Sequence, residues 1–285
     1  MKFASDLEKK TFEKLIEQLP NLIEKKCQGY DEMYGYKLLP GEHYDEDIAH
    51  ALVYKYCKAY KFQYDEAVSN LCSTLNWRRE FDPLSAAFSE RHDETLNNVG
   101  LLTRYEDEQP NRKVVTWNLY GELSKQKQVF ADVNKFLRYR VGLMERSIGL
   151  LDFKDETNDY VAQVHDYDGV SMWRMDPDIK KCTKQVIAVF QKHYPEMLSA
   201  KFFINVPSLL TWVYDVVKRF VNEETKRKFV VLNDGTKLGQ YLPAAPSKLY
   251  GGKSKQTLLE QNVLEVKPTP YALYLFEQKV GADVE

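Results

Sequence analysis

The pattern of apolar and polar positions divides this chain into a helical first third and a mixed remainder. Apolar residues recur at helical spacing over residues 5–26, 47–60 and 64–81. A turn at Gly29 follows the first pattern, and Asp82-Pro83 ends the third. The first third therefore predicts amphipathic helices.

After Val99 the pattern changes to short runs that are rich in β-branched and aromatic residues. Helical patterns separate these runs, and strands that alternate with long helices are typical of a largely parallel sheet with helices packed on it. The sequence thus predicts an α/β fold. The four predicted strands are residues 113–120, 160–167, 201–207 and 228–232.

Two of the helical patterns carry features that matter for function. Residues 127–151 form an apolar stripe that includes Arg140, with apolar neighbours three or four residues away on either side. An arginine in that position must find a partner. Residues 207–221 form a broad apolar face, with charged residues only toward one side.

Composition narrows the classes of function. The chain has 285 residues, with 40 Lys and Arg against 42 Asp and Glu, so no global field attracts nucleic acid. Its four cysteines are widely spaced, with no C-x-x-C, which argues against a zinc site or covalently attached haem and favours reduced thiols in the cytosol. No apolar stretch is long enough to span a bilayer, so we expect membrane contact to be peripheral.

Motifs for catalysis are missing. The sequence contains no G-x-S-x-G, no P-loop, no H-E-x-x-H and no G-x-G-x-x-G after a strand. We therefore expect a protein that is not an enzyme.

Strand 160–167 places an unusual pair of side chains on one face. Because side chains alternate along a strand, Gln163, His165 and Tyr167 share one side. They are either satisfied interior polar groups or a ligand site, and this segment alone favours the first interpretation. In the second, Tyr167 binds a ferric ion as a phenolate, and a cation such as Arg140 helps it to lose its proton.

Several motifs between residues 47 and 253 occur in the order seen in the CRAL-TRIO family of Sec-fourteen-type lipid-binding and lipid-transfer proteins, which this chain resembles. The resemblance implies a helical bundle over residues 1–95 and a CRAL-TRIO domain with a C-terminal extension over residues 96–285. In that fold a mostly parallel sheet floors an apolar pocket, and a gate helix, here Ser208 to Val221, closes it. The motifs are "CKAYKFQYDEAVSNLCSTLNWRREF", "VHDYDGVS", "HYPEMLSAKFFINVP", "NEETKRKFVVL" and "YGGK".

The resemblance also implies a site for the head group of phosphatidylinositol. The positions that match the family's head-group residues are Glu196, Thr225 and Lys228. Lysine suits the phosphate, while glutamate and threonine suit sugar hydroxyls. The family's R-A-R-K-F motif is "KAYKF" here, residues 58–62, and so loses the fork of an arginine.

His165 and Tyr167 replace apolar residues beside the Asp of the family's D-x-x-G motif, which resembles the fungal non-classical branch that binds ferric haem b. This implies Tyr167 as the axial ligand of the iron, His165 beside it, and Arg140 in support of the phenolate. Tyr120 and Lys201 match further haem-contacting positions, and Lys201 suits a haem propionate.

The sequence as a whole predicts a cytoplasmic protein in peripheral contact with endoplasmic reticulum or microsomal membranes. We expect it to bind or transfer phosphatidylinositol, to hold ferric haem b without a covalent bond, and to act in phosphoinositide homeostasis and in haem- or oxidant-related stress. One alternative is a haem-dependent peroxidase or catalase-like enzyme, although no distal acid/base pair is recognisable. Another is a pure lipid carrier in which His165 and Tyr167 only line the cavity.

Overall fold

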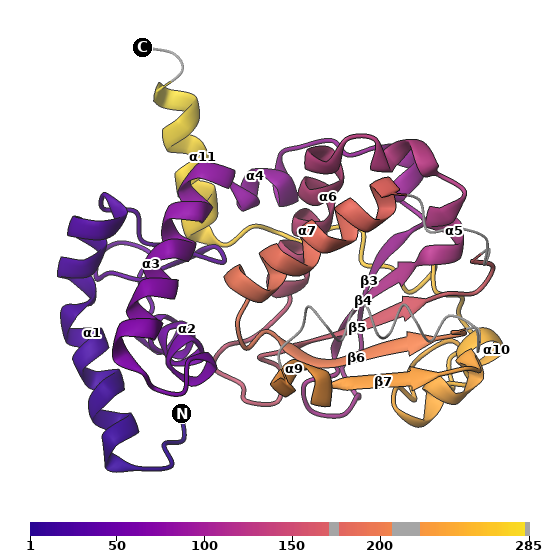
Figure 1. Cartoon of the computed structure of the whole chain (residues 1–285), viewed down its shortest axis with the longest axis horizontal. Helices are drawn as coiled ribbons and strands as arrows, with labels where there is room; N and C mark the ends of the chain where they lie inside the picture. Colours follow the sequence, from indigo (N-terminus) through magenta and orange to yellow (C-terminus); the bar gives the residue numbers. More distant parts are fainter. Residues whose placement is uncertain (171–176, 207–222, 283–285) are drawn as a thin grey trace.

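The computed structural model describes residues 1–170, 177–206 and 223–282, and Figure 1 shows a helical part beside an α/β part. The helices predicted for the first third are confirmed to within one residue at each end. A two-stranded hairpin lies between the first two of them. The elements are α1 (Asp6–Cys27), β1 (Glu32–Met33), β2 (Tyr36–Lys37), α2 (Glu46–Ala59) and α3 (Tyr64–Phe81).

Asp82 and Pro83 end one helix and begin the next. Asp82 takes the left-handed conformation with φ 53°, and its carboxylate accepts a hydrogen bond from the Ser85 N–H. Pro83 then occupies the first position of α4 (Pro83–Phe88), where its fixed φ fits and its missing N–H costs nothing.

The α/β part is built on a five-stranded sheet in the order β3-β4-β5-β6-β7. The first pair is antiparallel and the other three pairs are parallel, so the mixed, mostly parallel sheet predicted from the sequence is confirmed. The edge strand β3 was not predicted. The strands are β3 (Gly100–Arg104), β4 (Val114–Leu119), β5 (Val161–Asp166), β6 (Leu198–Ile204) and β7 (Phe229–Leu232).

The two faces of the sheet have different cover. On one face α6 (Val133–Ile148) packs against β3 and β4, and α7 (Pro177–His193) packs against α6 (Figure 1). On the other face Val164, Trp117 and Phe202 form a core with residues of the C-terminal part, among them Leu238 and Tyr250. The remaining elements are η1 (Glu94–Leu96), α5 (Tyr120–Ser124), η2 (Lys127–Phe130), α6 (Val133–Ile148), α7 (Pro177–His193), α9 (Glu223–Arg227), η4 (Gly235–Gln240) and α10 (Ser247–Tyr250).

The last helix, α11 (Pro270–Ala282), returns to the helical part and lies beside α3 in Figure 1. The Tyr271 hydroxyl donates to Asp31 Oδ1 at 2.6 Å, and Lys279 Nζ lies 2.6 Å from Asp82 Oδ2. The C-terminal helix thus stabilises the helical part, which no pattern in the sequence indicated.

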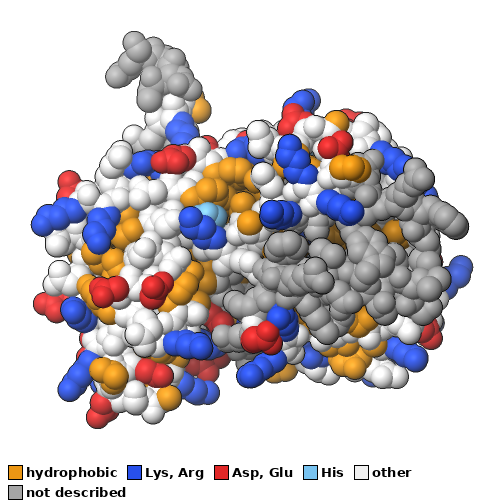
Figure 2. Space-filling view, in the orientation of Figure 1, with side chains coloured by type: hydrophobic (Ala, Val, Ile, Leu, Met, Phe, Trp, Pro, Cys, Tyr) orange, Lys and Arg blue, Asp and Glu red, His pale blue; other side chains and the backbone are white. Residues whose placement is uncertain are grey.

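Charge on the surface is mixed. In the face shown in Figure 2, basic and acidic side chains are interspersed over the helical part. Across the described residues, no helix has both the length and the apolar character that crossing a bilayer requires. The four cysteines are all buried and free.

A buried ionic network joins the helical part to α6. The Arg78 guanidinium, on α3, lies 2.7 Å from Glu32 Oε1 and 2.7 Å from Glu145 Oε1, and its side chain is fully buried. The Tyr194 hydroxyl donates to the same Glu145 oxygen at 2.6 Å. One arginine thus serves two carboxylates from other elements, and the Tyr194 hydroxyl adds a further donor to Glu145.

Replacing Arg78 with methionine is expected to lower the free energy of unfolding by about 3–5 kcal/mol, because it leaves two carboxylates buried without a cation. Urea denaturation measures the change. Arg104→Met is the control, because Arg104 pairs with Glu106 at the surface and such pairs contribute at most about 1 kcal/mol. Equal losses in both variants would contradict the argument.

Candidate functional site

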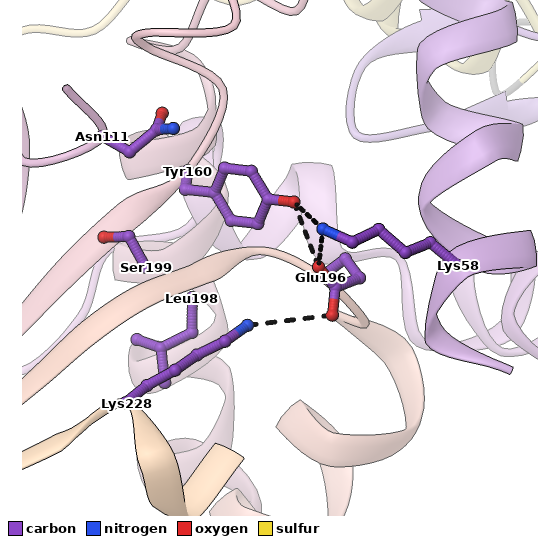
Figure 3. A pocket seen from close by; sticks show the side chains of 7 residues that line it. All are labelled: Lys58, Asn111, Tyr160, Glu196, Leu198, Ser199 and Lys228. Atoms are coloured by element: carbon purple, nitrogen blue, oxygen red, sulfur yellow. Dashed lines mark hydrogen bonds and ion pairs between the residues drawn. The ribbon is translucent and has the colours of Figure 1, made fainter. Parts of the chain in front are cut away.

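Four polar side chains from separate segments form one group, which we call the head-group cluster: Lys58, Tyr160, Glu196 and Lys228 (Figure 3). Lys58 lies in the last turn of α2, and Tyr160 directly precedes β5. Glu196 lies in the turn between α7 and β6, and Lys228 lies between α9 and β7. The cluster therefore links the helical part to one end of the sheet.

The Glu196 carboxylate is the centre of this cluster. Its Oε2 atom accepts a hydrogen bond from the Tyr160 hydroxyl at 3.0 Å and lies 2.9 Å from Lys58 Nζ. Its Oε1 atom lies 3.7 Å from Lys228 Nζ. Lys58 also donates to the Tyr160 hydroxyl at 2.9 Å, so that hydroxyl accepts one hydrogen bond and donates another.

The charges in the head-group cluster do not cancel. Burial works against a charged Glu196, but Lys228 and Lys58 outweigh it and hold the pKa of the carboxyl below its ordinary value. Burial raises the pKa of Tyr160 to about 12, so the phenol is neutral at pH 7. Two lysines face one carboxylate, and the cluster carries a net positive charge of one.

The head-group cluster borders a cavity of about 320 Å³, which Asn111, Leu198 and Ser199 also line (Figure 3). Glu196 has φ 52°, in the left-handed region, which costs a residue other than glycine about 1 kcal/mol or more. Such strain is typical of functional positions, and here it directs the carboxylate to the two lysines.

Lys55 also supports the head-group cluster, a role that no pattern in the sequence indicated. Its Nζ atom lies 2.9 Å from Asp159 Oδ2, donates to the Glu196 carbonyl at 3.1 Å, and sits 3.5 Å from the centre of the Tyr160 ring. Burial lowers the pKa of Lys55 to about 8, despite the opposing effect of Asp159. Lys55 thus contacts both Glu196 and Tyr160, two of the residues that line the cavity.

Two parts of the predicted lipid site cannot be placed in full. Thr225 lies in α9, but its side chain is outside the described part of the structure. The predicted gate helix, Ser208 to Val221, also lies outside the described residues.

A second group, which we call the aromatic–basic cluster, contains Tyr120, Arg140, His165, Tyr167 and Lys201. Strand register explains the grouping. Asn118, His165 and Phe203 are paired across β4, β5 and β6, and Gln163 is paired with Lys201 two residues earlier. Arg140 reaches this face from α6, where its guanidinium donates to the side-chain oxygen of Asn118. All five residues therefore lie on the α6 side of the sheet.

The rings of the aromatic–basic cluster are stacked. The Tyr120 ring centre lies 5.0 Å from that of Tyr167, at 15° between planes, and 5.3 Å from that of His165. Gly121 makes this approach possible, because a Cβ atom there would lie 1.7 Å from the Asp168 carbonyl oxygen. Gly169, with φ 72°, completes the turn after Tyr167.

The electrostatics of the aromatic–basic cluster follow from burial beside two cations. Burial, Lys201 and Arg140 lower the pKa of His165 well below its ordinary value, so the imidazole is neutral. Burial and Arg140 lower the pKa of Lys201 to about 7. Burial and Tyr120 raise the pKa of the Tyr167 phenol, against the effect of Arg140.

Within the described residues, two polar atoms of the aromatic–basic cluster lack a hydrogen-bond partner. His165 Nε2 is buried without a hydrogen bond, and the Tyr167 hydroxyl has no hydrogen bond to any described residue. Asp166 points to the other face, where it accepts hydrogen bonds from Tyr250 at 2.9 Å and Asn205 at 2.8 Å. Among the described residues no group of three or more His, Cys, Asp or Glu could hold a bare metal ion.

The two clusters lie toward opposite ends of β5. Tyr160 directly precedes the strand and Tyr167 directly follows it. Seven residues of extended chain span roughly 20 Å. Two ligands, or the two ends of one long ligand, can therefore be held apart on this sheet.

Comparisons with known proteins agree with this architecture. The model of the CRAL/TRIO domain matches residues 100–252, and that of the CRAL/TRIO N-terminal domain matches residues 9–73. Proteins named phosphatidylinositol transfer protein SFH5 are 56% identical over 293 residues in Candida glabrata and 55% over 294 residues in Saccharomyces cerevisiae, with 100% of both chains covered. A solved structure titled "Crystal structure of Sfh5" is 55% identical with a TM-score of 0.97, over 99% of this chain and 100% of that one.

Proposed function

Because this chain belongs to the CRAL/TRIO family, we propose that it binds and transfers phosphatidylinositol and that it also binds ferric haem b without a covalent bond. The first activity is the one named for its relatives. The second is our own extension, and the aromatic–basic cluster carries it.

The head-group cluster supports the lipid activity. Its net charge of plus one is neutralised by one phosphodiester, which Lys228 and Lys58 can meet once they turn from Glu196. Glu196 and Tyr160 are then free to bond inositol hydroxyls. Thr225 joins this set by family resemblance.

Lipid transfer involves no bond chemistry on this proposal. The acyl chains leave the bilayer for apolar protein surroundings, and each Å² of apolar surface kept from water is worth roughly 25 cal/mol. The cost that remains is the phosphate charge, which the two lysines offset. Protein and bilayer thus both keep the acyl chains from water and both accommodate the phosphate charge. The lipid can therefore exchange between them in both directions.

One observation carries the haem proposal. In the described part of the chain, the His165 Nε2 atom and the Tyr167 hydroxyl have no hydrogen bond, and the two basic groups beside them, Arg140 and Lys201, have no acidic partner. Tyr167 would be the axial ligand, with His165 beside it. Arg140 would stabilise the phenolate against the burial that keeps the phenol protonated. When bound, the haem would supply a ferric iron, the oxidation state that tyrosinate favours.

We further infer a cytoplasmic protein that reaches endoplasmic reticulum membranes peripherally and serves phosphoinositide homeostasis and the response to haem or oxidants. Family resemblance supports this part of the proposal. The two proposed ligands fit these roles, because one is a membrane lipid and the other is an apolar, redox-active pigment.

Two measurements on the purified full chain test the proposal. We expect added ferric haem to give a visible spectrum typical of tyrosinate-ligated iron, and we expect transfer of labelled phosphatidylinositol between vesicles. A protein that stays colourless with adequate haem would leave a pure lipid carrier. Absence of transfer would remove the lipid half, and peroxide turnover that depends on Tyr167 would indicate an enzyme.

A further inference from the structure

Helix α7 presents lysines to the surface along one face. Over its length a single acidic residue, Asp178, stands against four lysines, and the side chains of all four are exposed. The buried side of the helix carries Cys182 and His193. In Figure 2 basic side chains lie over α7. We call these residues the α7 lysine face: Lys180, Lys181, Lys184 and Lys192.

The N-terminal helix, by contrast, balances its charges. Helix α1 carries five lysines and five acidic residues, and Lys9 pairs with Glu13 one turn later at 3.8 Å. In α7, Lys180, Lys181 and Lys192 form no ion pair with any residue that the structure describes. The whole chain has a net charge of −2, so α7 concentrates positive charge on a molecule that has no excess of it.

The stability of α7 does not explain this arrangement. Lys180 and Lys184 are four residues apart, and Lys181 and Lys184 are three apart, so like charges face one another and destabilise the helix. Lys180 is also the fourth residue of α7, close to the positive end of the helix dipole, where a cation is disfavoured. An external surface of negative charge would offset both costs.

The C-terminal end of the α7 lysine face lies beside exposed aromatic surface. The Trp77 ring, on α3, stacks on that of Phe81 with 4.8 Å between ring centres. It also stacks on the ring of His193, which follows Lys192, at 4.2 Å. Trp77 and Phe81 both keep part of their surface exposed. Aromatic rings beside lysines are typical of the interface between lipid and water.

Helix α7 leads directly to the head-group cluster. It ends at His193, and Glu196 follows in the next turn. Lys192 is four residues from Glu196, so at most roughly 14 Å of chain separates their Cα atoms. A partner bound to this end of α7 is therefore close to the proposed lipid site. This position suits a bilayer, which must deliver the lipid, better than it suits a nucleic acid.

We propose that the α7 lysine face docks on the anionic surface of a bilayer and holds the protein there while lipid is exchanged. This rests on the proposed transfer of phosphatidylinositol and adds the surface through which the protein meets the membrane. Each lysine near an anionic membrane contributes about fivefold in affinity. The attraction is electrostatic, so salt weakens it.

Sedimentation of the full chain with vesicles tests the proposal. We expect vesicles of phosphatidylcholine with added phosphatidylserine to bind the protein, vesicles of phosphatidylcholine alone to bind it at least tenfold more weakly, and added salt to release it. Phosphatidylserine supplies negative charge without an inositol for the head-group cluster. Loss of three lysines from α7 should weaken binding at least tenfold, and the same loss of charge from α1 should not. The variants are Lys180→Gln/Lys181→Gln/Lys192→Gln and the control Lys10→Gln/Lys25→Gln/Lys26→Gln, all exposed positions.

The α7 variant is expected to unfold at the temperature of the wild type or above it, because it relieves the pairs of like charge. Thermal unfolding followed by circular dichroism checks this, so that weaker binding is not mistaken for loss of the fold.

Equal binding to both kinds of vesicle, or an equal loss in both triple variants, would overturn the inference. RNA binding that the α7 variant loses, without binding to anionic vesicles, would replace it with a nucleic-acid surface. If the wild type transfers phosphatidylinositol but does not bind anionic vesicles, this inference fails and the lipid proposal stands. If it docks through α7 and transfers no lipid, the docking surface stands and the transfer proposal fails.

Discussion

The Tyr167→Phe variant is expected to lose the visible spectrum of ferric haem and to transfer phosphatidylinositol as the wild type does. The change removes the oxygen that would bind iron but keeps the ring that stacks on Tyr120. Outer-shell partners of a metal alone are worth about 10–100-fold in affinity, so we expect loss of the ligand itself to cost roughly 100-fold or more. Absorption titration with ferric haem measures the affinity, and vesicle transfer measures the second activity.

Tyr241→Phe is the matched control, because Tyr241 packs on Phe202 on the opposite face of the sheet. It should retain both the spectrum and lipid transfer. A Tyr167→Phe variant that kept an unchanged spectrum would mean that the phenolate is not the ligand. His165 would then be the next candidate, since its Nε2 atom has no hydrogen bond.

The sequence predicted the regular elements because their spacing is local. The amphipathic helices α1, α2 and α3 follow a period of 3.6, and β5 alternates with a period of two, which correctly put His165 and Tyr167 on one face. The edge strand β3 was missed, because it has only five residues and its short apolar run resembles any buried segment. The return of α11 to the helical part was missed, because that contact joins residues more than 200 positions apart.

The candidate sites show the same limit. The need of Arg140 for a partner was clear from its apolar neighbours, but the partner, Asn118, lies on a strand 22 residues earlier. Lys55 and its partner Asp159 are 104 positions apart, so no local pattern connects them. Only the folded chain brings such pairs together.

Tyr160 changes the interpretation of the altered helix motif. The sequence suggested that lysine in place of arginine at position 58 loses a fork of donors. In the structure the Lys58 amine reaches both Glu196 and the Tyr160 hydroxyl, and that hydroxyl in turn donates to Glu196. The tyrosine thus supplies to the carboxylate a second donor beside the single amine of Lys58.

The double variant Glu196→Ala/Lys228→Ala is expected to reduce phosphatidylinositol transfer at least tenfold and to leave the haem spectrum unchanged. It removes both Lys228, a cation for the lipid phosphate, and Glu196, the acceptor for the inositol hydroxyls. Charge-assisted hydrogen bonds contribute about 1.5–3 kcal/mol each, so the loss of two exceeds a factor of ten. Transfer of labelled phosphatidylinositol between vesicles measures the effect, and Lys9→Ala/Glu13→Ala, an exposed pair on α1, is the control.

Both positions must change, because after a single substitution the remaining residues of the head-group cluster can still bind the phosphate. Without Lys228 alone, Lys58 still meets a phosphate, and without Glu196 alone, both lysines lose their counterion and attract phosphate more strongly. The haem spectrum should survive in the double variant, because Tyr167 lies roughly 20 Å along β5 from Tyr160. Lys201 is closer, but it contacts Lys228 through a backbone hydrogen bond of 2.8 Å, which alanine at position 228 retains. If the double variant and Tyr167→Phe each lost both activities, the two clusters would act as one site, and separate determinants for lipid and haem would have to be abandoned.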